Sequence, residues 1–226
     1  MTSRALSPRS TSHPDRPHIH FTPETGWMND PCGLIRLGDT FHLFYQHNPD
    51  AVEWGNMHWG HASSTDLLEW RHHQLALTPD HVGQIFTGCV VLDRDDTAVF
   101  GLGSLIAVFT HEGPLGQVQS LAWSSDQAMT WTKFDRNPVL SAPSPTPDFR
   151  DPKVVRFGNG TDGVWVMALS VGHVIEFYRS SDLQDWVFAS RFEPTGTSQA
   201  ILEVPDLIDM PNPDGGRTWV LLYSIL

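Results

Sequence analysis

Short apolar and β-branched runs alternate with turn-forming residues from Phe21 to the end of the chain. No long stretch keeps the 3.6-residue spacing of an amphipathic helix, so the pattern favours strands. Gly38-Asp39 and Asn159-Gly160 each separate a pair of such runs, and both dipeptides suit tight hairpins because they tolerate positive φ. The sequence therefore predicts an all-β protein.

The predicted strands fall into four successive groups, the last of them incomplete. They are residues 33–37, 41–45, 57–63 and 70–76; 88–92, 104–110, 118–124 and 131–134; 153–157, 164–170, 174–180 and 186–192; and 206–210 with 218–224. Each full group has the four strands of a β-propeller blade, and the first strand of every blade lines the central channel. We therefore expect about three and a half blades of a propeller.

A repeated motif supports this grouping. Paired serines lead to an aspartate and then to a tryptophan three times, at Trp70, Trp131 and Trp186, which are 61 and 55 residues apart. Common propeller blades repeat at about 40 to 50 residues, so these blades are somewhat long. We expect the tryptophans to pack within blades. Because a propeller hides its edge strands by closing on itself, we also expect the chain to be a fragment of a longer protein.

Composition restricts the class of partner. The 226 residues carry a formal net charge of −12, which argues against nucleic acid or an anionic membrane as partner and favours a small neutral ligand. Residues 1–16 lack periodicity and are predicted to form a disordered tail, and residues 17–226 a partial catalytic propeller domain. No oligomeric state is predicted.

The two cysteines and the histidines predict no metal site. Cys32 and Cys89 lack the spacing of metal ligands, and His58 and His61 have no third ligand nearby in the sequence. We expect free thiols in a reducing compartment, with a Cys32–Cys89 disulfide as the less favoured alternative. With no secretory signal in the first twenty residues and no apolar run long enough to span a bilayer, the expected location is the cytoplasm.

Three carboxylates stand at or just before residue-plus-proline steps that precede β-branched runs: Asp30, Asp151 and Glu203. Proline suits the first residue of a strand, so we expect these acids at the mouths of three inner strands. In a propeller they would converge on one point. Converging carboxylates suggest glycoside hydrolysis, which needs an ionised nucleophile and a protonated acid.

The neighbours of these acids suggest different pKa values. We expect Arg150 to keep the adjacent Asp151 charged. Glu203 lies between Leu202 and Val204, so we expect burial to raise its pKa. These arguments leave open which acid performs which role.

Five blocks of sequence carry a family resemblance: residues 27–33, 44–49, 54–62, 149–153 and 203–207. Together they resemble the invertase and fructanase group, glycoside hydrolase family 32, from about Pro17 to the last residue. The resemblance implies a five-bladed β-propeller followed by a β-sandwich, which this chain lacks. It also implies cleavage of terminal β-linked fructose with retention of configuration.

The resemblance assigns roles to individual residues. It implies that Asp30 is the nucleophile, Glu203 the acid/base, and Asp151 the residue that holds the fructose hydroxyls. It implies no metal or organic cofactor. The positions that it matches to the fructose pocket are Asn29, Gln46, Trp54, Phe86, Thr87 and Arg150.

Four positions depart from the commonest pattern of the family. Cys32 stands where asparagine is usual, Thr87 and Cys89 where serines are usual, and Val204 where a cysteine normally follows the acid/base. Because Val204 removes a polarisable thiol from beside Glu203, we expect a shifted pH optimum.

The first hypothesis is therefore a β-fructofuranosidase that acts on sucrose or a related fructoside. A fructan exohydrolase acting on levan or inulin is the nearest alternative. A hypothesis from another class is an inactive, truncated sugar-binding fragment. Five-bladed propeller enzymes that cleave arabinan and xylan with inversion are disfavoured by the blocks around Trp27 and Trp54.

Overall fold

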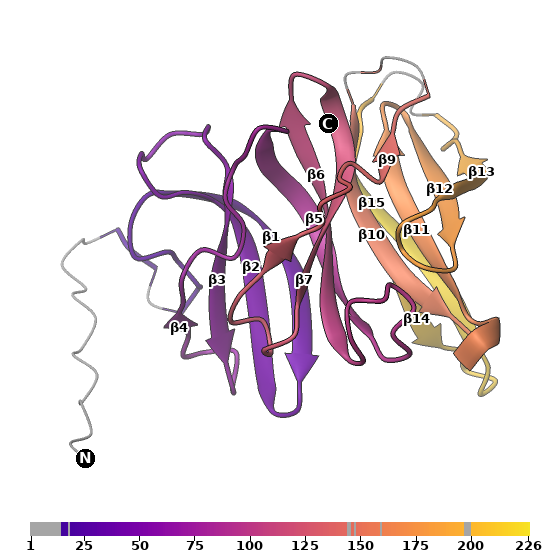
Figure 1. Ribbon diagram of the computed structural model, residues 1–226, viewed down its shortest axis with the longest axis horizontal. Helices are drawn as coiled ribbons and strands as arrows, with labels where there is room; N and C mark the ends of the chain where they lie inside the picture. The colour runs from indigo at the N-terminus through magenta and orange to yellow at the C-terminus, as the bar shows by residue number, and fades with distance from the viewer. Residues whose placement is uncertain (1–14, 18, 144–145, 147, 159, 197–199) are drawn as a thin grey trace.

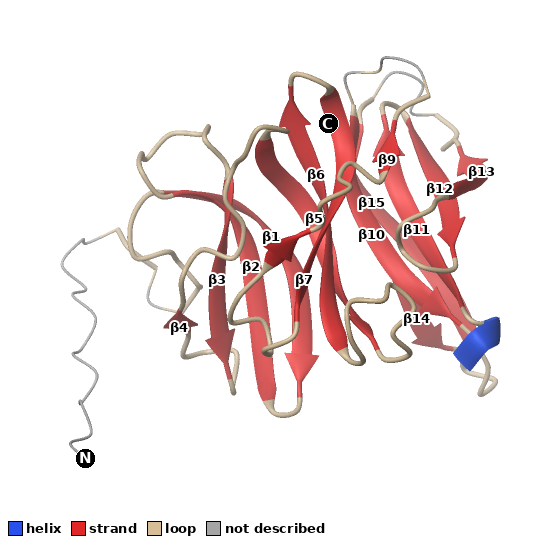
Figure 2. Ribbon diagram, viewed as in Figure 1, coloured by secondary structure: helices blue, strands red, loops and turns tan. Residues whose placement is uncertain are grey.

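The computed structural model describes residues 15–17, 19–143, 146, 148–158, 160–196 and 200–226. This part of the chain is built from strands, with one short 3-10 helix at Gly160–Asp162 (Figure 2). The all-β prediction is confirmed. Residues 1–14 of the predicted tail and Asn159 of the predicted hairpin turn lie outside the described residues.

The strands form four antiparallel sheets, which follow one another in chain order (Figure 1). Sheet 1 contains β1 (Trp27–Leu37), β2 (Thr40–Asn48), β3 (His58–Ser64) and β4 (Arg71–His72). Sheet 2 contains β5 (Gln84–Asp93), β6 (Ser104–Gly113), β7 (Gly116–Ser124) and β8 (Thr132–Lys133), with β9 (Leu140–Ser141) beside β7. Sheet 3 contains β10 (Phe149–Phe157), β11 (Val164–Val171), β12 (Val174–Ser180) and β13 (Val187–Phe192), and sheet 4 contains β14 (Leu202–Pro211) and β15 (Arg217–Ile225).

The first strands of the sheets are neighbours: β1 contacts β5, β5 contacts β10, and β10 contacts β14. We call these four the inner strands. Each begins four or more residues before the predicted start, at Trp27, Gln84, Phe149 and Leu202. The prediction was wrong there because it took proline as the first residue of a strand, whereas Pro31, Pro152 and Pro205 lie inside strands.

Sheet 2 is buried on both faces, which explains its continuous apolar runs. Along β6, Leu105, Ala107 and Phe109 pack against sheet 1, while Ile106 and Val108 pack against sheet 3. A third, smaller cluster joins sheet 3 to sheet 4. Sheet packing therefore fixes how neighbouring inner strands face one another.

The repeated serine–aspartate–tryptophan motif forms the turn between the third and fourth strands of a sheet. In sheet 3, the Ser180 hydroxyl accepts a hydrogen bond from the Leu183 amide at 2.8 Å, and Trp186 Nε1 donates to the Leu183 carbonyl at 2.8 Å. The turn at Ser64 in sheet 1 is built in the same way. Trp186 also packs against the core between sheets 2 and 3, so its predicted packing role is confirmed.

None of the described residues belongs to a helix that is long and apolar enough to cross a membrane.

A buried histidine cluster lies in and beside sheet 1. His42 Nδ1 and His61 Nε2 are 3.0 Å apart, and the His61 ring stacks on Phe44 and on His73 with centroids 4.6 and 4.5 Å away. Burial, with smaller contributions from His73 and His42, lowers the pKa of His61 to about 3. Burial also lowers the pKa of His42. The folded protein thus keeps this cluster neutral in mild acid.

We predict that the free energy of unfolding falls as the pH drops from 7 to 5. The unfolded chain protonates His61 near pH 6.5 while the folded chain does not, so the unfolded state binds more protons in this window. The shift of His61 alone costs about 2 kcal/mol of stability by pH 5. Urea unfolding of the wild type and of His61→Phe measures the effect.

The His61→Phe variant should lose less stability than the wild type between the two pH values. His20→Gln, at an exposed position, serves as the control and should behave like the wild type. An equal loss in the wild type and in His61→Phe contradicts the prediction.

Candidate active site

Each inner strand carries a β-bulge at the same level. The extra residue falls between Met28 and Pro31 in β1, Ile85 and Gly88 in β5, Arg150 and Lys153 in β10, and Glu203 and Asp206 in β14. A bulge places two residues opposite one and redirects side chains, and bulges are common next to active sites. The bulges therefore bring the three predicted acids to one level.

The register corrects the equivalence on which the sequence argument rested. Pro152 and Pro205 occupy the bulge position that Asp30 has in β1, not the position of Pro31. The three acids consequently stand at three different places within equivalent bulges. Their convergence follows from the bulges rather than from the proline steps.

Two of the bulges contain non-glycine residues with positive φ. Asp151 has φ of 61° and Val204 has φ of 44°, at equivalent positions in β10 and β14. Such a conformation is unusual for a β-branched residue and costs on the order of 1–3 kcal/mol, which the surrounding contacts must offset. Two of the strained residues of the chain are thus one of the acids, Asp151, and the neighbour of another, Val204.

Asp30 lies on β1 and is held by the neighbouring inner strand. The Thr87 hydroxyl of β5 donates a hydrogen bond to Asp30 Oδ2 at 3.2 Å. On the residue before Asp30, the Asn29 side-chain oxygen accepts a hydrogen bond from Trp27 Nε1 at 2.9 Å. The structure thus orients Asp30 from β5 and Asn29 from within β1.

Asp151 is the most buried of the three acids, with 7% of its surface exposed. Its Oδ2 accepts a hydrogen bond from the Val204 amide at 3.0 Å, which ties β10 to the residue after Glu203. Burial raises the pKa of Asp151 to about 6. The Val204 amide and Arg150 lower this pKa, whereas the charges of Asp30 and Glu203 raise it further, so both other carboxylates lie within electrostatic range of Asp151.

Arg150 contacts a different acid from the one that we expected. Its Nη2 donates to Glu203 Oε1 at 2.8 Å, and its Nη1 donates to Asp148. Successive side chains on a strand point in different directions, so adjacency did not pair Arg150 with Asp151. Arg150 lowers the pKa of Asp151 in the expected direction, but burial raises it by more. Glu203 has a guanidinium beside it where we expected apolar surroundings.

Three further predicted pocket residues have contrasting environments. Gln46 is 2% exposed, and its Nε2 has no hydrogen-bond partner, so a buried donor is free to bind a ligand. Trp54 is 57% exposed and therefore lies outside the core. Its ring meets Phe86 edge to face with centroids 6.0 Å apart. Trp54 and Phe86 form an apolar wall of the kind that binds a sugar face.

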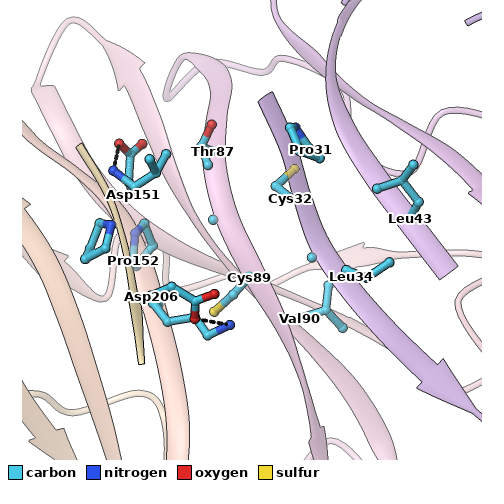
Figure 3. A pocket seen from close by; sticks show the side chains of 15 residues that line it. Pro31, Cys32, Leu34, Leu43, Thr87, Cys89, Val90, Asp151, Pro152 and Asp206 are labelled. Atoms are coloured by element: carbon cyan, nitrogen blue, oxygen red, sulfur yellow. Dashed lines mark hydrogen bonds and ion pairs between the residues drawn. The ribbon is translucent and has the colours of Figure 1, made fainter. Parts of the chain in front are cut away.

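A cavity of about 350 Å³ lies between the inner strands. Asp151 and Thr87 line the cavity at one end, and Cys89 and Asp206 lie further along it (Figure 3). The sequence reasoning missed Lys153 and Asp206, whose side chains pair at 2.8 Å across β10 and β14. Each directly follows a proline, Pro152 or Pro205, and that shared position is the signal that could have identified them.

The thiols and histidines behave as structural groups. Cys32 and Cys89 are free and buried, so the prediction of free thiols is confirmed, and burial raises the pKa of Cys89 to about 11. Within the part of the chain that the structure describes, no three His, Cys, Asp or Glu side chains gather as they would around a metal ion. His58 Nδ1 instead contacts the Asn56 carbonyl at 2.6 Å.

We predict that the Asp151→Asn substitution increases the free energy of unfolding more at pH 7.5 than at pH 4. The pKa of Asp151 is higher in the folded chain than in the unfolded chain, so its contribution is favourable below about pH 4 and is lost as the pH rises through about 6. The amide removes a burial penalty of up to about 3 kcal/mol at neutral pH. Urea unfolding at the two pH values measures the difference, and a difference between variant and wild type that does not change with pH contradicts the prediction.

Comparisons with known proteins address the family. Residues 20–225 match the model of the glycosyl hydrolases family 32 N-terminal domain. The levanase of Bacillus subtilis (strain 168) is 44% identical over 217 residues, which cover 93% of this chain and 32% of the levanase.

Solved structures agree with this match. The exo-inulinase of Aspergillus awamori aligns with a TM-score of 0.85 and 35% identity, covering 94% of this chain and 46% of that one. The β-fructofuranosidase of Schwanniomyces occidentalis, complexed with fructosyl-erythritol, aligns with a TM-score of 0.84 and 37% identity, covering 92% and 42%. The chain thus spans between a third and a half of the length of these relatives. Because the family model covers almost its whole length, the chain belongs to glycoside hydrolase family 32.

Proposed function

We propose that the whole protein is a retaining glycoside hydrolase that releases terminal β-linked fructose from sucrose or a related fructoside. The observation that carries the proposal is that Asp30, Asp151 and Glu203 stand in or beside the bulges of three inner strands. Asp151 lines the cavity, and the other two carboxylates lie within electrostatic range of it. The relatives are named levanase, exo-inulinase and β-fructofuranosidase, which supports the substrate class.

In the first step, an Asp30 oxygen attacks the anomeric carbon of fructose, and the bond to the leaving oxygen breaks. The leaving oxygen takes the proton of Glu203, which becomes a carboxylate. Arg150, 2.8 Å from Glu203, stabilises the charge that forms there. The Thr87 hydroxyl, 3.2 Å from Asp30 Oδ2, holds the attacking group in place.

In the second step, water attacks the same carbon and breaks the fructosyl ester of Asp30. Glu203 accepts the proton of that water and returns to its acid form. Two displacements at one carbon restore the original configuration. Asp151 would bind fructose hydroxyls throughout, and the unpartnered Nε2 of Gln46 would donate to the sugar.

The substrate has a second candidate. The 44% identity to a levanase favours a fructan exohydrolase, which removes fructose from the end of a polymer. Trp54, exposed beside Phe86, would contact the sugar unit next to the bond that breaks. We also keep the cytoplasm as the predicted location.

The proposal extends to architecture, with five blades closing around the channel in the whole protein. It is supported by apolar side chains that remain exposed on β13 and β15, among them Phe188 and Leu222, which are each 52% exposed. Further strands would cover them. The alternative of an inactive sugar-binding fragment requires that the whole protein bind fructosides without turnover.

We predict that Asp30→Asn and Glu203→Gln each lower turnover of sucrose by about a thousandfold or more in the whole protein, because each removes a group that reacts directly. The control is Asp209→Asn, on the same strand as Glu203 but paired with Arg217 at 2.6 Å. The control should retain wild-type turnover. Wild-type turnover in either Asp30→Asn or Glu203→Gln refutes the assignment.

A comparison of substrates separates the two candidate activities. The β-fructofuranosidase proposal predicts that kcat/KM for sucrose equals or exceeds that for levan and inulin, measured as released fructose. A kcat/KM about tenfold higher for levan, equivalent to about 1.4 kcal/mol, favours the fructan exohydrolase instead. Binding of these sugars without release supports the inactive fragment.

A further inference from the structure

Side chains of sheet 2 hold the backbone of β10 at the point where it enters the candidate site. The Phe149 amide donates to Gln117 Oε1 at 2.7 Å, and the Phe149 carbonyl accepts from Gln119 Nε2 at 2.6 Å. Both glutamines lie on β7 with one residue between them, so their side chains share a face of the strand. The start of β10 is thus hydrogen-bonded to side chains of a neighbouring sheet as well as paired with its own partner strand, β11.

Thr110, on β6, connects Gln119 to Asp151 through two hydrogen bonds. Its hydroxyl donates to Gln119 Oε1 at 2.8 Å and accepts from the Asp151 amide at 3.1 Å. The bulge removes Asp151 from the regular pairing of β10 with β11, and its φ is 61°. Thr110 thus accepts a hydrogen bond from the amide that the bulge takes out of the ladder.

The same group of residues reaches the acid/base. Arg150 Nη1 donates to Gln117 Oε1 at 3.4 Å, and Nη2 of the same guanidinium donates to Glu203. Gln117 therefore accepts from both the backbone of β10 and the side chain that contacts Glu203. One connected set of hydrogen bonds runs from sheet 2 to two of the three acids.

Burial makes this set costly unless every bond is made. Thr110 and Gln119 are fully buried and Gln117 is 8% exposed. Between the same two sheets, Ile106 and Val108 belong to an apolar core cluster. Polar side chains at such depth favour one geometry strongly, because a shift of the backbone leaves buried donors and acceptors unpaired.

We propose that Thr110, Gln117 and Gln119 are positioning residues for the reaction, which set the place of Asp151 and Arg150 without touching the substrate. This inference rests on the proposed function, because a positioning role requires that the reaction take place. Its physical core is the set of hydrogen bonds between sheet 2 and residues 149–151. These residues govern the level at which Asp151 meets fructose and the direction from which Arg150 approaches Glu203.

The test uses four variants of the whole protein. Thr110→Val keeps the shape and removes the hydroxyl, Gln119→Leu removes both amide contacts, and Thr110→Ser keeps the hydroxyl. The matched control is Ser120→Ala: Ser120 is fully buried on β7, but its hydroxyl bonds to His111 within sheet 2, at 2.8 Å. The control loses an equally buried hydrogen bond that does not reach β10.

We expect kcat for fructose release to fall about 10- to 100-fold in Thr110→Val and in Gln119→Leu, with KM changed less than about threefold, since misplaced groups weaken the transition state more than binding. Thr110→Ser should remain within about threefold of the wild type, and so should Ser120→Ala. Amide hydrogen exchange of a peptide spanning residues 149–154 should be about tenfold faster in Thr110→Val and unchanged in Ser120→Ala.

Equal losses of kcat in Thr110→Val and Ser120→Ala overturn the inference, because they would reflect general destabilisation. Unchanged exchange at 149–154 in Thr110→Val also overturns it. A wild type that releases no fructose refutes the proposed function but leaves the exchange comparison intact, so the two failures are distinguishable. If Gln119→Leu does not fold, Thr110→Val with its serine rescue still decides the outcome.

Discussion

One extra residue in each of four inner strands is the feature on which the candidate site depends. Regular antiparallel pairing alternates side chains between two faces, so a channel-facing position would recur only at every second residue. The bulges break this alternation at one level, where Asp30, Asp151 and Glu203 stand at three different bulge positions. Three sheets can thereby direct three different groups to one place. The same device on β5 supplies Thr87, which contacts Asp30.

This arrangement carries a cost in stability. Asp151 combines a positive φ, almost complete burial and a pKa of about 6, and each is unfavourable for an aspartate in a folded chain at neutral pH. The surrounding sheets provide the compensation. Sheet 2 packs apolar clusters on both faces, and three of its buried polar side chains, Thr110, Gln117 and Gln119, bond to residues 149–151. The site is thus imposed by the core rather than by local preference.

Sequence reasoning identified what local chemistry determines. The strand predicted at 174–180 coincides with β12, and that at 164–170 lies within β11, because apolar runs bounded by turn residues define both ends. The three acids were proposed as site residues because each stands in a block of distinctive residues. The starts of the inner strands were missed, since proline reads locally as a boundary and the bulges that admit it depend on pairing with the next strand.

Side-chain contacts between different sheets could not be predicted from the sequence either. Adjacent residues suggested that Arg150 would pair with Asp151, whereas the strand directs the guanidinium to Glu203, 53 positions along the chain. Gln117 and Gln119 carried a visible signal, two amides at alternate positions of a buried strand, but nothing local says that they meet Phe149. Such contacts depend on how the sheets stack, which propensity and spacing do not encode.

The most direct test is to identify the carboxylate that becomes covalently attached to fructose. The whole protein carrying Glu203→Gln, mixed rapidly with a fructoside that has an activated leaving group, should accumulate the intermediate because departure needs no acid while hydrolysis lacks its base. Peptide mass spectrometry is predicted to find one added fructosyl group on the peptide that contains Asp30. A fructosyl group on the peptide containing Asp151, or product of inverted configuration with no labelled peptide, would contradict the account.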